Sequence, residues 1–277
     1  MSKRQKFVIA TLVLLAGIVA IRLFPGVLIQ WRFRVAIFSL LAVLASVWAL
    51  FDEDFAGVEW VILPILPAMF AVSAAVVFPL LPTGFDLIAQ VPLSPDAGSL
   101  LGLLVRIAHL GVFVVGYYAA LLTTNIYNVA AIRTIQLLRV AHSIGFLVTV
   151  ATALFFYIVI SAFHLSSFLN FLAVFGVTLP LAFQSLWSVN LEEKVSGQTR
   201  NFALLTAIVL GQIAWALSFW PIGVSIFALF LTAIFYELIG IIQYHFGERL
   251  SPRIANEFVL VAVVMFFVVV FTTRWGS

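Results

Sequence analysis

Four polar side chains interrupt long apolar stretches of this sequence. Arg106 and His109 lie in one stretch, Gln212 lies in another, and Glu237 lies in a third. An ionised group near the centre of a bilayer costs about 2.5 to 3.5 kcal/mol on insertion scales, so such a group needs a partner or a function. Arg106 and His109 stand at positions i and i+3, which places both on one helix face. One hypothesis is therefore that these four residues bind a solute or a proton in an interior cavity.

A structural interpretation of the same residues is the alternative. Arg106 can extend its guanidinium towards the membrane surface, Glu237 can reach the other surface or remain uncharged, and His109 can be a hydrogen-bonded core residue. At 1.5 Å of rise per residue, Arg106 and Glu237 differ in depth by about 12 Å. His109 or a chain of water molecules is therefore the expected partner of Glu237. His142 is expected to anchor a helix end at the membrane boundary.

The composition indicates that a bilayer surrounds most of the chain. Apolar residues make up 64% of the 277 positions and charged residues 9%, and the mean hydropathy is +1.22. Soluble domains have roughly 25% charged residues, and this chain has too few to cover a water-exposed surface. Its basic residues are scattered singly, so no nucleic-acid partner is expected. The chain has no cysteine, which excludes disulfides and thiol nucleophiles.

The lengths of the apolar stretches predict the fold class. A hydrocarbon layer of about 30 Å needs roughly 20 helical residues, and a backbone in lipid must form its hydrogen bonds within its own segment. We therefore predict an all-α fold, a polytopic transmembrane helical bundle of about nine spans in one integral membrane domain, residues 1–277. Pro64, Pro67 and Pro180 should bend their helices. The expected spans are 7–23, 35–51, 58–81, 100–122, 141–163, 168–188, 202–220, 222–243 and 258–273. Of the connections, only 82–99 and 123–140 are long, and the second can form a short interfacial helix.

The distribution of basic residues predicts an orientation. Cytoplasmic loops of membrane proteins carry an excess of lysine and arginine. With the N-terminus in the cytoplasm and the C-terminus outside, Arg22, Arg32, Arg34 and Arg274 are the outer basic residues. The inner ones are then Lys3, Arg4, Lys6, Arg133, Arg139, Lys194, Arg200, Arg249 and Arg253. This orientation satisfies the rule, although the first outer turn is rich in arginine.

Acidic residues after the second and sixth spans form another candidate site. Asp52 and Asp54 follow the second span, and Glu192 follows the sixth. Carboxylates suit Mg²⁺, which can hold a diphosphate. The architecture resembles that of intramembrane prenyltransferases, and the resemblance implies a metal site at these three residues. Prenyltransferase aspartates recur at i and i+4, whereas Asp52 and Asp54 are two positions apart, and a solvated acidic turn is the alternative.

A second resemblance rests on two short sequences. Residues 124–139 read TNIYNVAAIRTIQLLR, and residues 217–221 read LSFWP. Both are similar to uncharacterised bacterial multi-pass membrane proteins that are grouped as a domain of unknown function. The resemblance implies a bacterial inner membrane and brings no known active residues with it.

These observations leave two functional hypotheses. The first is a non-enzymatic multi-pass protein, either a permease-like bundle for a small solute or a lipid, or an accessory scaffold. The second is a membrane-embedded transferase that acts on lipid or prenyl diphosphate substrates. The sequence contains no phosphate-binding glycine loop, no H-E-x-x-H, no G-x-S-x-G and no dinucleotide fingerprint, so no cofactor is expected. The lipid bilayer is the expected partner, together with an unidentified small-molecule or lipid substrate.

Overall fold

The structure is a computed structural model that describes residues 1–23, 31–51, 59–81, 95–132, 136–191 and 194–273. Within these ranges the regular structure is helical throughout and contains no strand, which confirms the predicted all-α fold. The helices are α1 (Lys3–Leu23), α2 (Trp31–Leu50), α3 (Glu59–Ile62), α4 (Ile65–Val77), η1 (Phe78–Leu80), α5 (Pro95–Ile132), α6 (Leu138–Ala162), α7 (Ser167–Asn190), α8 (Gly197–Leu217), α9 (Val224–Phe246) and α10 (Pro252–Thr272).

Nine helical stretches of the described chain are long and apolar enough to cross a membrane, as predicted. The third stretch, Glu59–Leu80, comprises α3, α4 and η1. Its break lies at Pro64, which cannot donate a backbone hydrogen bond and whose ring clashes with the preceding turn. Pro67 lies in the first turn of α4, where a missing N–H is tolerated. α7 continues as one helix through Pro180.

The fourth span is longer than expected, because α5 continues to Ile132 and takes in much of the connection expected at 123–140. Two polar residues beyond position 122 are buried and hydrogen-bonded inside the protein. Thr124 Oγ1 donates to the Ala120 carbonyl at 2.9 Å, and the Tyr127 hydroxyl donates to the Ala141 carbonyl of α6 at 3.0 Å. These bonds remove the cost of burying polar groups, so the helix extends past the point where the sequence becomes polar.

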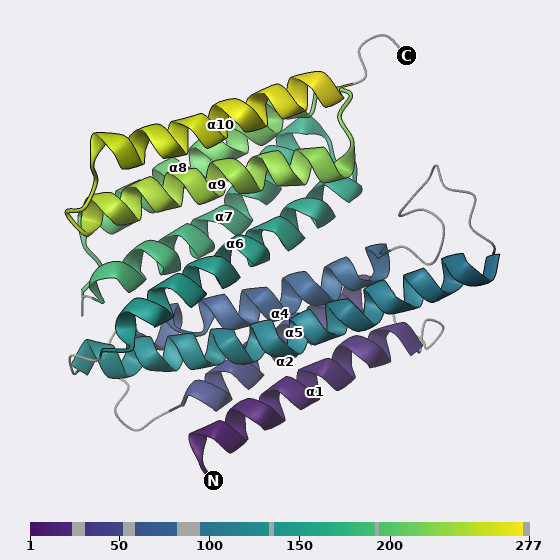
Figure 1. Ribbon diagram of the computed structural model, residues 1–277. Helices are drawn as coiled ribbons and strands as arrows, with labels where there is room; N and C mark the ends of the chain where they lie inside the picture. The colour runs from purple at the N-terminus through teal and green to yellow at the C-terminus, as the bar shows by residue number, and fades with distance from the viewer. Residues whose placement is uncertain (24–30, 52–58, 82–94, 133–135, 192–193, 274–277) are drawn as a thin grey trace.

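The helices form two groups that meet at α6 (Figure 1). In the first group α1, α2, α4 and α5 pack around one hydrophobic core. In the second group α7, α8 and α9 pack with α6 around another core. α6 also contacts α4 and α5, so it joins the two groups. α10 lies at the edge of the second group, where α9 is its principal neighbour.

Successive long helices run in opposite directions, so their ends gather at two faces of the bundle. The first residues of α1, α6, α8 and α10 lie at the same face as the last residues of α5, α7 and α9 (Figure 1). A hydrogen bond of 3.1 Å from Lys3 Nζ to Asn125 Oδ1 joins the start of α1 to the last third of α5 at this face. We call it the amino-terminal face. The end of α10 lies at the opposite face (Figure 1).

Gly211 gives a test of how closely α7 and α8 pack. A Cβ atom at position 211 would lie 2.8 Å from Phe171 Cδ2 and 3.2 Å from the Phe171 carbonyl oxygen. Gly211→Ala should therefore push the two helices apart, at a cost of about 1 to 3 kcal/mol, and lower the melting temperature in detergent. Gly176→Ala in α7 is the control, because nothing lies within 4 Å of its added Cβ. Equal melting temperatures for the two variants would contradict the packing described.

Candidate functional site

His109 is a hydrogen-bonded core residue in the structure. Its Nε2 lies 2.9 Å from the Ala74 carbonyl oxygen of α4, and because a carbonyl only accepts, Nε2 is the donor. The imidazole lies against two aromatic rings, with centroid distances of 5.8 Å to Phe78 and 5.5 Å to Phe155. His109 therefore joins α5 to α4 and packs against α6, which agrees with the structural interpretation of this residue.

The other three predicted binding residues occupy different surroundings. Arg106 is half-buried, and its Nη2 has no hydrogen-bond partner among the described residues. Glu237 of α9 is buried, and its Oε1 also has no hydrogen-bond partner there. Gln212 is exposed on the outer surface of α8. An unpartnered buried carboxyl or guanidinium is costly, so Arg106 and Glu237 remain candidates for a function.

These residues belong to different helix groups. α5, which carries Arg106 and His109, packs against α1, α2, α4 and α6, whereas α9, which carries Glu237, packs against α6, α7, α8 and α10. A cavity shared by Arg106, His109 and Glu237 therefore stays a prediction. The acidic residues Asp52, Asp54 and Glu192 of the predicted metal site lie outside the described residues.

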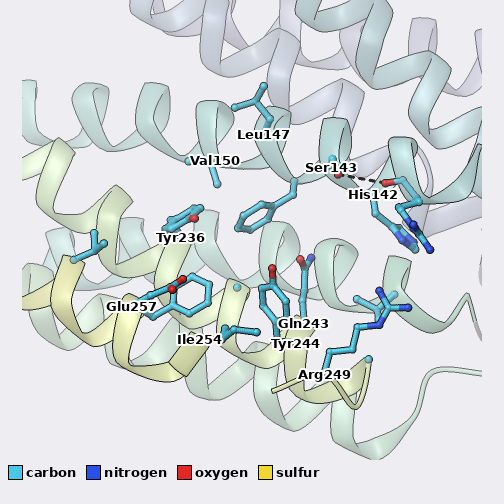
Figure 2. Close-up of a pocket in the computed structure, with 17 residues that line it drawn as sticks. His142, Ser143, Leu147, Val150, Tyr236, Gln243, Tyr244, Arg249, Ile254 and Glu257 are labelled. Carbon is cyan, nitrogen blue, oxygen red and sulfur yellow. Dashed lines mark hydrogen bonds between the residues drawn. The ribbon is translucent and has the colours of Figure 1, made fainter. Parts of the chain in front are cut away.

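A groove of about 1010 Å³ lies elsewhere, between α6, α9 and α10 (Figure 2). We call it the lateral groove. It forms because α9 is the principal neighbour of α10, so that α6 and α10 flank α9 and leave a space between them. The groove is lined by Arg139, His142, Ser143, Phe146, Leu147, Val150, Val189, Tyr236, Gly240, Gln243, Tyr244, Gly247, Arg249, Ile254, Glu257, Phe258 and Val261.

The floor of the groove is formed where α9 and α10 meet. At this point the surface of α9 has a notch, and the Phe258 ring of α10 occupies it. Tyr236, Gly240 and Tyr244 recur every four residues and thus share one face of α9. The Phe258 ring lies over Gly240, since a Cβ at Gly240 would be 2.7 Å from Phe258 Cε1. Ring centroids of Tyr236 and Tyr244 lie 5.7 and 6.0 Å from that of Phe258. The missing side chain at Gly240 thus allows α10 to approach α9 closely.

His142 of α6 and Gln243 of α9 line the groove, and each donates a hydrogen bond to α7. His142 Nε2 donates to the Ser188 carbonyl oxygen at 2.7 Å. Gln243 Nε2 lies 3.1 Å from the Ser185 carbonyl oxygen and 3.0 Å from the Ser185 hydroxyl oxygen. Both side chains therefore use donors to hold α6 and α9 against the last turns of α7, a structural role close to the one expected for His142 at a helix end.

The polarity of the lining changes along the groove. Arg139 lies in the first turn of α6 and Arg249 follows the end of α9, so both are at the amino-terminal face. Further along α6, Phe146, Leu147 and Val150 line the groove. The rise from Arg139 to Val150 is about 16 Å at 1.5 Å per residue. The groove therefore runs from a basic end at the helix termini into an apolar part beside the middle of the helices.

A turn of defined geometry positions Arg249. α9 ends in a Schellman motif, in which Glu248 has a left-handed φ of 53°. The Glu248 N–H donates to the His245 carbonyl at 3.1 Å, and the Arg249 N–H donates to the Tyr244 carbonyl at 3.0 Å. These two bonds satisfy the last carbonyls of α9 and reverse the chain towards α10. The backbone of Arg249 is thereby held at the mouth of the groove.

The fold and the groove define a class: an all-helical bundle with nine membrane-length apolar helices in its described part and a groove open at its side. The family model for "Protein of unknown function (DUF5656)" matches residues 16–272, and the chain belongs to this family. This match confirms the resemblance to an uncharacterised family that residues 124–139 and 217–221 suggested. No curated protein and no solved structure matches the chain.

Proposed function

We propose that this protein is a non-enzymatic, permease-like membrane protein whose cargo is a membrane lipid, and that the lipid binds in the lateral groove. The observation that carries the proposal is the lining of the groove, which is basic at the amino-terminal face and mainly apolar further along, where Tyr236 and Glu257 are the polar members. A lipid has the same order of parts, with a polar headgroup at the membrane surface and acyl chains beside the middle of the helices. A water-soluble solute would not need the apolar part.

The outer surface of the bundle supports the membrane location. The exposed side of α10 is apolar along most of its length, and nine stretches of the described chain have the length and hydropathy of membrane spans. In water, a continuous apolar surface of this size would promote aggregation. In lipid it is the expected surface, so the bilayer is the partner proposed for this chain. The exposed apolar residues of α10 include Val259, Leu260, Val263, Val264, Phe266, Phe267 and Phe271.

Basic residues support a cytoplasmic location for the amino-terminal face. Among residues with described side chains, the opposite face carries Arg34 near the start of α2. The excess on the amino-terminal face matches the positive-inside rule, and the sequence resemblance suggests a bacterial inner membrane. In this proposal the groove opens to the cytoplasmic leaflet. The basic residues of the amino-terminal face are Lys3, Arg4, Lys6, Arg139, Lys194, Arg200, Arg249 and Arg253.

Blocking the apolar part of the groove tests the proposal. Val261 lines the groove, whereas its neighbour Leu260 is exposed outside it. Val261→Trp should fill the space for acyl chains and lower the fraction of protein that retains a lipid by about tenfold, which corresponds to about 1.4 kcal/mol. Native mass spectrometry of the full chain released from detergent micelles measures this fraction.

Leu260→Trp is the matched control, since it places the same side chain on the same helix but outside the groove. It should retain lipid as the unmodified protein does. The proposal is wrong if the unmodified protein retains no lipid, or if the two tryptophan variants retain equal amounts.

A further inference from the structure

We infer that the lateral groove selects lipids with an anionic phosphate headgroup, and that Arg139 and Arg249 hold this headgroup from two sides. The inference rests on the proposed function, because it names the class of lipid that the groove would take. Its basis is the arrangement of charges at the mouth of the groove.

Arg139 and Arg249 reach the groove from different elements. Arg139 belongs to the first turn of α6, and Arg249 belongs to the turn between α9 and α10, so the two flank the mouth. Figure 2 places Arg249 at the same end of the groove as His142, which is one turn after Arg139 in α6. Both arginine side chains are exposed, and neither has a hydrogen-bond or ion-pair partner within the part of the chain that the structure describes. Two unpaired guanidinium groups suit a phosphate, which accepts bidentate hydrogen bonds from arginine.

The neighbouring polar groups of the groove are already engaged. His142 and Gln243 donate to carbonyl oxygens at the end of α7, at 2.7 Å and 3.1 Å. The bond from His142 also satisfies the Ser188 carbonyl, one of the last four of α7, which have no acceptor role within the helix. The arginines are therefore the cationic groups at the mouth that remain available to a ligand.

The start of α6 is a second source of positive potential on the Arg139 side of the mouth. Its N-cap residue is Leu137, which makes no side-chain cap hydrogen bond. The first N–H groups of this 25-residue helix thus lack a side-chain acceptor from the N-cap. A helix N-terminus carries about half a positive charge, and this charge favours an anion close to Arg139.

Glu257 is the acidic residue in the lining, and its position leaves the mouth basic. It lies further along the groove than Arg249 (Figure 2). Its Oε1 is 3.4 Å from Arg253 Nε, and Arg253 does not line the groove. Its charge is thus partly balanced from outside the groove, and within the described residues neither arginine at the mouth has an ion-pair partner.

The test compares two lipids with the same acyl chains and different headgroups. Nanodiscs that contain the full chain are prepared with phosphatidylglycerol, which is anionic, and phosphatidylcholine, which is zwitterionic, and native mass spectrometry measures the lipid that stays bound. Two basic residues beside an anionic headgroup should give the unmodified protein a preference for phosphatidylglycerol of about tenfold. The double variant Arg139→Gln/Arg249→Gln should lose this preference and still bind phosphatidylcholine. Arg139→Lys/Arg249→Lys should keep part of it.

Lys194→Gln/Arg200→Gln is the matched control. It removes the same charge from the same face, and neither residue lines the groove. The preference should be unchanged in this variant. If it falls as far as in the arginine variant, the preference reflects the charge of the whole face and the inference is overturned. A double arginine variant that keeps the full preference overturns it as well.

The outcomes also separate this inference from the proposed function. Equal binding of both lipids by the unmodified protein, with Val261→Trp still blocking both, would overturn the headgroup inference and leave the lipid groove intact. Binding of neither lipid would overturn both. Millimolar inorganic phosphate should not displace bound phosphatidylglycerol; if it does so completely, the ligand is a free anion and the inference fails.

Discussion

Trp187→Ala is expected to destabilise the bundle by about 3 kcal/mol or more. Trp187 of α7 is 2% exposed and is the largest of the fully buried side chains among the described residues. It belongs to the core cluster of the first helix group although it lies on a helix of the second, so it fills space where the two groups meet. Alanine would leave a cavity that neighbouring helices cannot close without moving, and the lost dispersion contacts would not be replaced.

Thermal unfolding in detergent, followed by the loss of monomeric protein on size exclusion, measures this effect. Trp48→Ala is the control, because Trp48 of α2 is 42% exposed and its removal opens no interior cavity. Its melting temperature should stay within a few degrees of that of the unmodified protein. If the two alanine variants melt at the same temperature, Trp187 does not have the packing role assigned to it.

The second large effect is expected at Glu237. This side chain is 5% exposed, its Oε1 has no hydrogen-bond partner within the described part, and its neighbours Phe235 and Ile239 are fully buried. Glu237→Lys would place an ammonium group in these surroundings, at a cost of about 2.5 to 3.5 kcal/mol on insertion scales. We expect this variant to fail to accumulate as folded protein.

Glu237→Gln is the matched variant, since it has the same shape and no charge. If Glu237 is uncharged in the folded protein, the amide should be tolerated with a small change in melting temperature. Yield of folded protein and melting temperature in detergent are the measurements. A large loss of stability in Glu237→Gln would mean instead that the carboxylate is charged and stabilised by a partner.

The sequence was sufficient to predict the fold class and the number of spans. A helix that crosses a bilayer must be as long as the hydrocarbon layer is thick and must be apolar over that length, and both properties can be read from the sequence. The break at Pro64 followed from the chemistry of proline. The end of α5 could not be predicted in this way, since Thr124 and Tyr127 are polar residues whose partners come from the folded structure. The mean hydropathy of a segment falls at such residues whether they face solvent or are buried and hydrogen-bonded, so the predicted span ended too early.

The lateral groove was missed for a different reason. A groove is a space between helices, and this one exists because α10 contacts mainly α9. That packing arrangement cannot be predicted from the type of any single residue. His142 was expected only as an anchor at a helix end, and Arg139 and Arg249 only as topology signals. One available signal was the recurrence of Tyr236, Gly240 and Tyr244 every four residues, which marks a small residue between two aromatic ones on one helix face.

The peripheral position of α10 also has a consequence for biogenesis. Because α10 follows the other described helices in the chain and rests mainly on α9, the ribosome completes those helices before α10 is available to dock. Until α10 docks, the notch at Gly240, between Tyr236 and Tyr244, is not covered by Phe258. The lateral groove is complete only once α10 has docked on α9, so the proposed lipid could bind there only after this step.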